Sequence, residues 1–139
     1  MTNSPGDHFE LINGFITRFA KERDIALDPL SDDGTTTVQR GSATVSIHVI
    51  ADRGVLLLLS KVMDVPDGDN SALYARLLSL SFLSTGDSAF AINDKSNEVY
   101  LRCYRELSGL DYAEFESLVH TIATVADEWD DKLRKEFAG

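Results

Sequence analysis

The stretch 71–107 constrains the fold most, because it predicts a helix followed by two strands. In its first part, Leu73, Leu77 and Leu80 recur at intervals of four and three residues, which is the period of an α-helix. The sequence 69–71 offers polar side chains that can cap the start of this helix. Gly86 is predicted to end it, since glycine readily takes the positive φ found at helix ends.

Two runs of alternating residues follow the predicted helix. Phe90 and Ile92 alternate with alanines, and after a polar loop at 93–97 three apolar residues alternate with larger polar ones at 99–104. Period-two alternation is typical of a β-strand with one buried face. The stretch therefore predicts a helix packed on a β-hairpin, with the remainder of the chain covering the rest.

The N-terminal part predicts a further helix, which begins near Ser4 and Pro5 and ends in the charged residues 21–24. Its main apolar row is spaced three and four residues apart and consists of Phe9, Ile12, Ile16 and Phe19. Leu11 and Phe15 lie beside this row. Most stripes of this kind are plain core contacts, but one this broad is able to serve two surfaces, the sheet and a second partner.

The region 35–59 predicts an antiparallel meander. The run 35–40 begins with four β-branched residues, and in the run 44–50 Val45, Ile47 and Val49 alternate with polar residues. The run 55–59 is apolar on both faces. Because the predicted helices cover one face of the sheet, we expect the second face of this strand to contact a partner.

The C-terminal part predicts the longest helix. Asp111 and Glu114 form a capping box, and Leu110 and Phe115 have the spacing of a hydrophobic staple. The apolar row runs toward Phe137 through Phe115, Leu118, Ile122, Val125, Trp129 and Leu133. The predicted order is α-β-β-β-α-β-β-α, an α+β fold with a twisted antiparallel sheet and helices packed on it, in a single domain covering residues 1–139.

Composition narrows the function. The net charge of −10 disfavours binding to nucleic acid or to anionic lipid, because both repel an acidic surface. The longest apolar run, 55–59, is too short to cross a bilayer, and the N-terminus lacks the pattern of a signal peptide. The single cysteine, Cys103, has no partner for an internal disulfide, which fits a reducing cytoplasm.

No catalytic or metal-binding signature is present in the sequence. The three histidines, His8, His48 and His120, fall on different predicted elements and match no metal-ligand spacing. The acidic run 64–69 lacks the spacing of an EF-hand loop. Cys103 paired with His48 or His120 is a formal alternative as a nucleophile, but a structural role suits a cysteine within a strand better. We therefore expect a binding protein without catalysis, metal or cofactor.

The order of elements, the helix ALYARLLSLSFLS, the strands AFAIND and EVYLRCYREL, and a capped last helix with a tryptophan resemble the class I chaperones of bacterial type III secretion, the Tir-chaperone family. The resemblance implies a cytoplasmic bacterial homodimer. It also implies binding of the unfolded N-terminal segment of a secreted effector, kept competent for export by strand addition and apolar anchoring.

The resemblance assigns residues to two surfaces. The effector-binding residues implied are Phe9, Ile12, Phe15, Ile16, Val45, Ile47 and Leu57. The dimer-interface residues implied are Leu73, Leu77, Leu80, Phe90 and Ile92. Two other classes stay open on the sequence: a regulatory or sensory module of α/β topology that binds another protein, and a small enzyme that uses Cys103 or a histidine.

Overall fold

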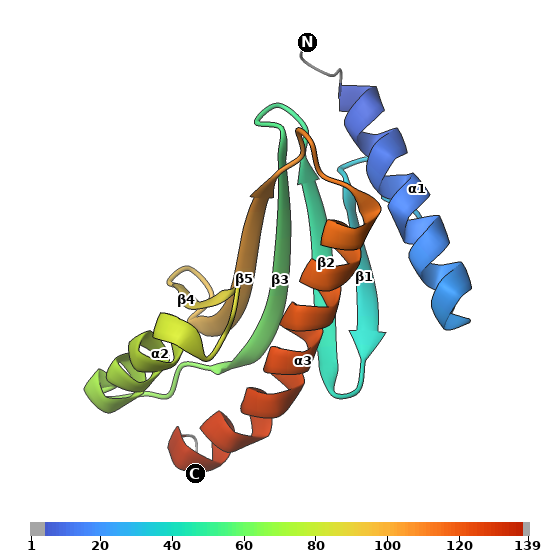
Figure 1. Ribbon diagram of the computed structural model, residues 1–139. Helices are drawn as coiled ribbons and strands as arrows, with labels where there is room; N and C mark the ends of the chain where they lie inside the picture. Colours follow the sequence, from blue (N-terminus) through green and yellow to red (C-terminus); the bar gives the residue numbers. More distant parts are fainter. Residues whose placement is uncertain (1–4, 138–139) are drawn as a thin grey trace.

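The computed structural model describes residues 5–137 and contains three helices and one five-stranded sheet (Figure 1). The predicted order of elements is confirmed. Ser4, the predicted first cap, lies outside the described residues. The elements are α1 (Pro5–Arg23), β1 (Thr35–Arg40), β2 (Ala43–Ile50), β3 (Val55–Asp64), α2 (Ser71–Leu83), β4 (Ala89–Asn93), β5 (Glu98–Glu106) and α3 (Tyr112–Phe137).

The sheet has the strand order β1-β2-β3-β5-β4, and every neighbouring pair is antiparallel. β1 and β2 form a hairpin closed by the pair Arg40–Ala43, and β4 and β5 form a second hairpin closed by Asn93–Glu98. Between them, β3 pairs with β2 on one side and with β5 on the other. As a result, β1 and β4 are the two edges of the sheet, and they lie at opposite ends of it.

The three helices pack on one face of this sheet. α3 crosses the sheet and contacts β3 most, with further contacts to β1, β2 and β5, while α1 packs beside β2 and α3 (Figure 1). α2 lies over β4 at the other end. Along β2, β3 and β5, side chains that point toward the helices alternate with side chains that point to the opposite face of the sheet. The apolar side chains on the helix side pack with those of the helices in one core. The fully buried α3 residues Phe115 and Ile122 belong to this core.

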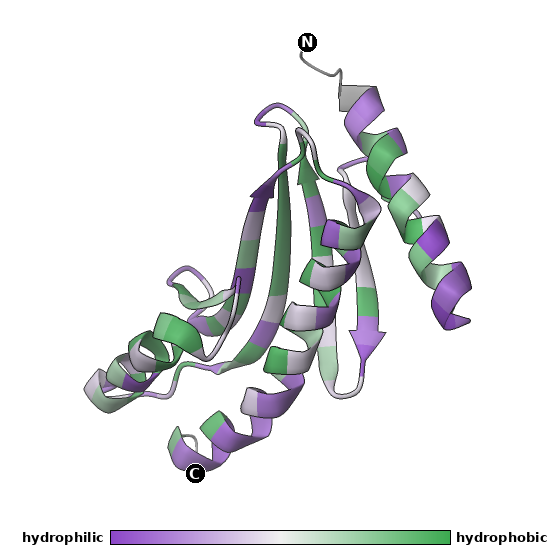
Figure 2. Ribbon diagram, in the orientation of Figure 1, coloured by the Kyte–Doolittle hydropathy of each residue, from purple (hydrophilic) through white to green (hydrophobic). Residues whose placement is uncertain are grey.

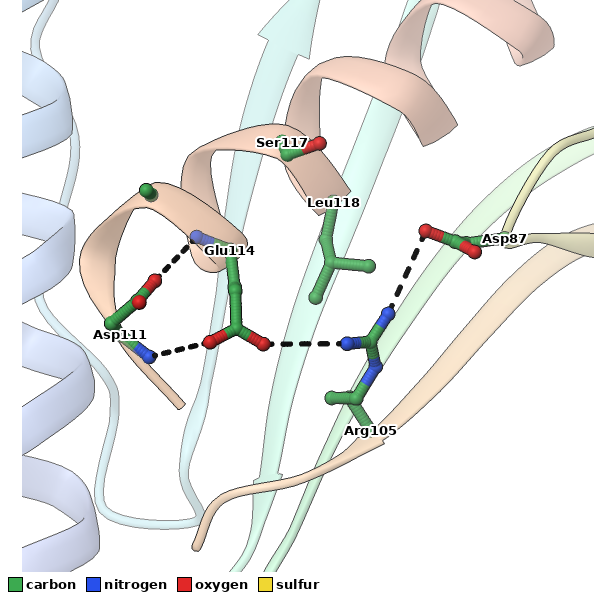
Figure 3. Close-up of a pocket in the computed structure, with 7 residues that line it drawn as sticks. Asp87, Arg105, Asp111, Glu114, Ser117 and Leu118 are labelled. Atoms are coloured by element: carbon green, nitrogen blue, oxygen red, sulfur yellow. Dashed lines mark hydrogen bonds and ion pairs between the residues drawn. The ribbon is translucent and has the colours of Figure 1, made fainter. Parts of the chain in front are cut away.

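The start of α3 has the predicted capping box. The backbone N–H of Glu114 donates to Oδ1 of Asp111 at 2.8 Å, and the N–H of Asp111 donates to Oε1 of Glu114 at 3.4 Å (Figure 3). These bonds satisfy two backbone donors that no helical carbonyl can reach. α2 ends at Leu83 with Ser84 as its C-cap, and Gly86 takes the predicted positive φ, 61°, in the turn that follows.

The face of the sheet opposite the helices is not covered by any described element. Along β3, Leu56 and Leu58 are buried under the helices, whereas Leu57 and Leu59 on the other face stay partly exposed. As expected, the run Val55–Leu59 is apolar on both faces of the strand. One face lies in the core, and the other is uncovered. We call the uncovered side the open face.

Candidate protein-binding surfaces

The effector-binding residues implied by the resemblance divide into two groups in the structure. Four of them are almost completely buried in the core, and these are Ile12, Ile16, Val45 and Ile47, each at most 2% exposed. Phe9, Phe15 and Leu57 are partly exposed. Only the second group offers side-chain surface to a partner in the conformation described.

Phe15 also contacts the helix α3. Its ring lies 5.9 Å from that of Tyr112 and 5.5 Å from that of Phe115, measured between centroids. The hydroxyl of Tyr112 donates to Glu22 at 2.7 Å, which adds a polar link between α1 and α3. Burial raises the pKa of Tyr112 to about 12, with the neighbouring Glu22 carboxylate contributing in the same direction. The second apolar row of α1 thus packs largely within the protomer.

The dimer residues implied by the resemblance show a similar division. Leu73, Leu77 and Leu80 point into the protomer's own core, and Phe90 is nearly buried. Ile92 is 38% exposed. The apolar row Leu73, Leu77 and Leu80, which the sequence pattern shows most clearly, therefore packs α2 onto the sheet of its own protomer.

A second apolar row on α2 faces outward. Its members are spaced four residues apart and are Tyr74, Leu78 and Phe82, and Leu83 lies beside the last of them. Leu78 is 74% exposed and Phe82 is 83% exposed, which is unusual for large apolar side chains. Much of α2 is accordingly coloured as hydrophobic in Figure 2. The spacing of this row was readable in the sequence, but sequence reasoning assigned the interface to the inner row.

A shallow groove runs between this helix and the adjacent edge strand. Its volume is about 280 Å³, and its lining is almost entirely apolar: Tyr74, Leu77, Leu78, Phe90, Ala91 and Ile92. The groove and the outer row of α2 together form a continuous apolar surface, which we call the α2–β4 surface. Exposed apolar patches of this kind on a folded protein mark sites of association.

The free edge of β1 is a second surface with unused binding groups. Val49 donates its N–H to Gly34 at 2.8 Å, and bonded and non-bonded pairs alternate along an antiparallel ladder. The backbone groups of Thr35, Thr37 and Gln39 therefore point away from β2. Thr35 is bonded to Ser31, and within residues 5–137 Thr37 and Gln39 have no backbone partner on that side.

The turn beside this edge is fixed to α3. The N–H and hydroxyl of Ser42 both donate to Oδ1 of Asp127, at 3.0 and 2.6 Å, and these bonds lower the pKa of Asp127. Gly41 has a φ of 58°, and a Cβ there would come within 2.9 Å of the same carboxylate. The β1–β2 hairpin is thus held in place, which leaves its outer edge presented in a defined position.

The opposite edge is partly closed by a side chain of its own helix. The hydroxyl of Ser81 on α2 accepts the outward N–H of Phe90 at 2.9 Å, and it donates to the carbonyl of Leu77 at 2.8 Å. β4 is also only five residues long. β1 is therefore the better edge for an added strand, and β4 contributes mainly apolar side chains.

A polar pocket at the start of α3 has a volume of about 280 Å³ and lies where β5 ends. Arg105 lies between two carboxylates, at 3.6 Å from Asp87 and 3.5 Å from Glu114 (Figure 3). Because both sides of the guanidinium are paired, the pocket offers no free cation to an anionic ligand. Its charged groups serve to join β5, the 84–88 turn and α3.

Neither Cys103 nor His48, two of the groups considered for catalysis, has an activating environment. Burial raises the pKa of the Cys103 thiol, which disfavours the reactive thiolate. Burial also lowers the pKa of His48, whose Nε2 lies 2.9 Å from the hydroxyl of Ser46. Among residues 5–137, no three acidic, histidine or cysteine side chains are grouped to hold a metal. Within the same range, no helix is long and apolar enough to cross a membrane.

The sequence model of the Tir chaperone protein (CesT) family matches residues 14–130. The chain belongs to this family. The match includes everything from the middle of α1 to the last third of α3, and so both surfaces described above lie within it. The predicted family, and the class of effector-binding secretion chaperone that it represents, are confirmed. No curated protein matches the chain in sequence.

Solved structures share the fold of this Tir-chaperone family member. A chain of the ExsC–ExsE complex aligns with a TM-score of 0.74 at 20% identity, covering 90% of this chain and 95% of that one. A chain of the ExoU–SpcU complex from the type III secretion system of Pseudomonas aeruginosa has a TM-score of 0.62 at 17% identity, with coverages of 85% and 93%. The predicted α+β architecture is confirmed by these similarities.

A solved structure that is described as a transcription regulator has a similar fold. YbjN, a putative transcription regulator from E. coli, aligns with a TM-score of 0.57 at 12% identity, covering 86% of this chain and 91% of that one. The architecture alone therefore does not separate a secretion chaperone from a regulatory module. Family membership makes that separation here.

Proposed function

We propose that residues 1–139 form one chaperone domain that acts as a cytoplasmic homodimer and holds an extended segment of a secreted effector ready for export. The observation that carries this proposal, beside family membership, is the presence of two unsatisfied surfaces on one protomer. The α2–β4 surface is apolar and exposed, and the β1 edge has free backbone donors and acceptors.

The α2–β4 surface suits a second copy of the chain. A two-fold contact uses the same patch twice, so the patch has to be complementary to itself. Here the projecting rings and branches of Phe82 and Leu83 lie on the same helix as the groove lined by Leu78 and Ile92. A projecting apolar group and an apolar groove on one surface satisfy that requirement. In a two-fold dimer, the projecting group of each protomer would enter the groove of the other.

The β1 edge suits an extended segment of a different chain. Thr37 and Gln39 together present two donors and two acceptors, which are sufficient to pair a short strand. The partly exposed side chains of Phe9 and Phe15 lie on α1, the helix that packs beside the β1–β2 hairpin. An unfolded effector segment gains backbone bonds at the edge and apolar contacts from this helix.

A chaperone role requires no catalytic group, and the described groups fit that requirement. The Cys103 thiol is kept in its protonated form by burial, and Arg105 is already paired on both sides. We accordingly propose binding without chemical turnover. The effector complexes named above, ExsC–ExsE and ExoU–SpcU, are further support for this class of function.

The test begins with purification of the protein and its bound partner from the native host, followed by calorimetry with the partner's N-terminal segment. Thr37→Pro removes an N–H that the protomer itself does not use, so we expect an intact fold and binding weakened at least about tenfold. Gln39→Pro is a second variant with the same expectation. Val38→Pro is the matched control, because its N–H points to β2 and its loss should disrupt the hairpin.

The outcomes separate the classes of function. A secreted partner bound through an unfolded segment supports the chaperone role. A partner that binds only as a folded domain, with affinity unchanged in Thr37→Pro and Gln39→Pro, would instead support a regulatory module. The similarity to YbjN makes this the second candidate.

A further inference from the structure

The open face carries a compact patch that neither the fold nor the surfaces above explain. Register places six side chains of β2, β3 and β5 in two rows across this face: His48, Leu57 and Tyr104 in one, and Ser46, Leu59 and Arg102 in the other. We call these six residues the open-face patch. Tyr104 is 50% exposed, and both leucines are partly exposed.

The patch has the chemistry of an interaction site. Its centre is formed by the two leucines, and beside them the guanidinium of Arg102 lies 5.5 Å from the ring centroid of Tyr104. Tyrosine and arginine are enriched among residues that dominate binding energies, particularly next to apolar contacts. Burying the leucines and the tyrosine ring removes apolar area from water and favours association.

Arg102 is the one group of the patch that needs a partner from outside. Arg102, on β5, makes no ion pair with any of residues 5–137. Lys61, an open-face cation on the neighbouring strand β3, is by contrast paired with Asp64 at 2.8 Å and with Glu98 at 2.7 Å. The patch itself contains no carboxylate. Although the chain has a net charge of −10, the unpaired guanidinium of Arg102 is a local positive charge that attracts a negatively charged group.

The other polar groups of the patch are already paired. Ser46 donates to the carbonyl of Leu59 at 3.2 Å, and Nε2 of His48 lies 2.9 Å from the Ser46 hydroxyl. Burial lowers the pKa of His48, which favours the neutral form of its ring. Covering these two side chains therefore leaves no unpaired charge behind, and the cost of burying them is small.

The backbone of the patch indicates what form the partner takes. β2, β3 and β5 each pair on both sides, so their backbone groups have no capacity left for an added strand. A partner has to bind through side chains. Three strands spaced about 4.8 Å apart span roughly 10 Å, which is about the diameter of one α-helix. One amphipathic helix fits this width.

A second copy of this chain does not fit the patch. A two-fold contact would bring two Arg102 guanidiniums into one interface, and neither of the two patches contains a carboxylate to pair with them. The patch does adjoin the β1 edge, because His48 and Ser46 stand opposite Thr35 and Thr37 in the sheet. A chain that pairs with β1 and then turns over the edge reaches the patch directly.

We propose that the open-face patch binds an amphipathic helix of the same effector chain, with its apolar stripe over Leu57 and Leu59 and a carboxylate beside Arg102. This inference rests on the effector-binding function proposed above and adds to it a second contact of defined chemistry. The strand at β1 supplies backbone pairing. The helix on the open face supplies apolar contact and the selection for an acidic residue.

The experiment uses the native chaperone–effector complex with a photo-crosslinking amino acid in place of Tyr104, and the same amino acid in place of Thr124 on the exposed side of α3 as control. We expect crosslinks from position 104 to one segment of the effector that contains an acidic residue, and none from position 124. Crosslinks from neither position, in a complex that forms normally, would overturn the inference.

Affinity measurements complete the test with matched variants. Arg102→Glu should weaken effector binding at least about tenfold, and Arg102→Lys should retain most of it. Arg53→Glu, in the exposed β2–β3 turn, makes the same change in net charge and should have little effect. Replacing the crosslinked acidic residue of the effector by arginine should restore binding to Arg102→Glu.

The results distinguish this inference from the function on which it rests. Binding that is lost in Thr37→Pro but unchanged in Arg102→Glu would overturn the open-face contact and leave the chaperone function standing. Equal losses in Arg102→Glu and Arg53→Glu would show a general charge effect and would also overturn it. Absence of any effector complex would overturn both proposals.

Discussion

α3 and α2 both contribute to the core, but their outward faces differ. α3 turns residues such as Asp127, Asp131 and Lys135 to solvent. Most of its apolar row is buried under the sheet and α1, and Trp129 and Phe137 at its C-terminal end are partly buried. α2 buries one apolar row and exposes another, with Leu78 and Phe82 on the outside. The difference teaches that a helix with one apolar side can bury that side within its own chain. A helix that is apolar on two sides needs a second surface to cover the other side.

The largest expected effect comes from comparing one aromatic side chain on each helix. Phe115→Ala on α3 removes a ring that is fully buried against Phe15 and Phe19, so unfolding should become easier by about 3–5 kcal/mol. Phe82→Ala on α2 removes an exposed ring and should leave the stability of the protomer nearly unchanged. Denaturant unfolding at a concentration where both variants are monomeric measures the two effects. Equal losses would contradict the contrast between the helices.

The starts of the two helices give a smaller contrast. Asp111→Ala breaks the capping box of α3 and should cost about 1 kcal/mol in the same unfolding measurement. At α2 the side chain of Asn70 makes no capping bond to the helix, and only Asp69 accepts from the N–H of Ser71, at 2.9 Å. Asp69→Ala should therefore cost less than Asp111→Ala. The reverse order would show that α2 depends on its cap more than on its packing.

The smallest effect concerns the link between α1 and α3 at high pH. The folded chain raises the pKa of Tyr112 to about 12, above the unfolded value of about 10, so the folded state holds this proton more tightly. The stabilisation is fully present below pH 10 and is lost as the pH rises toward 12. The tyrosinate absorbance of the wild type minus that of Tyr112→Phe gives the titration directly. A midpoint near 10 would contradict both the burial of the Tyr112 hydroxyl and its bond to Glu22.

The sequence predicted the order of elements and the limits of α3 because those follow from strong local signals. The capping box at Asp111 and Glu114, the helical period, and strand alternation are each encoded within a few neighbouring residues. Which of two apolar rows on α2 faces the sheet is not encoded locally. Leu73 and Tyr74 begin rows of equally helical spacing, and only the position of β4 decides between them.

The surfaces were harder to predict than the fold for the same reason. Val45 and Ile47 were recognised as one face of a strand, but their burial under the helices depends on contacts distant in sequence. The free backbone groups at Thr37 depend on the pairing register, and the unpaired state of Arg102 depends on what its neighbours on the sheet carry. Properties of this kind appear only once the elements are assembled.

The most direct test of this account is the mass of the protein in solution, measured by light scattering at micromolar concentration for the wild type and for Leu78→Asp. We expect a wild-type dimer and a folded Leu78→Asp monomer, since a carboxylate within the α2–β4 surface cannot be buried without a partner. Leu77→Asp, one residue away but on the inner row, should instead unfold the protomer. A monomeric wild type, or a Leu78→Asp protein that stays dimeric, would contradict the central claim that the outer face of α2 is covered by a second copy.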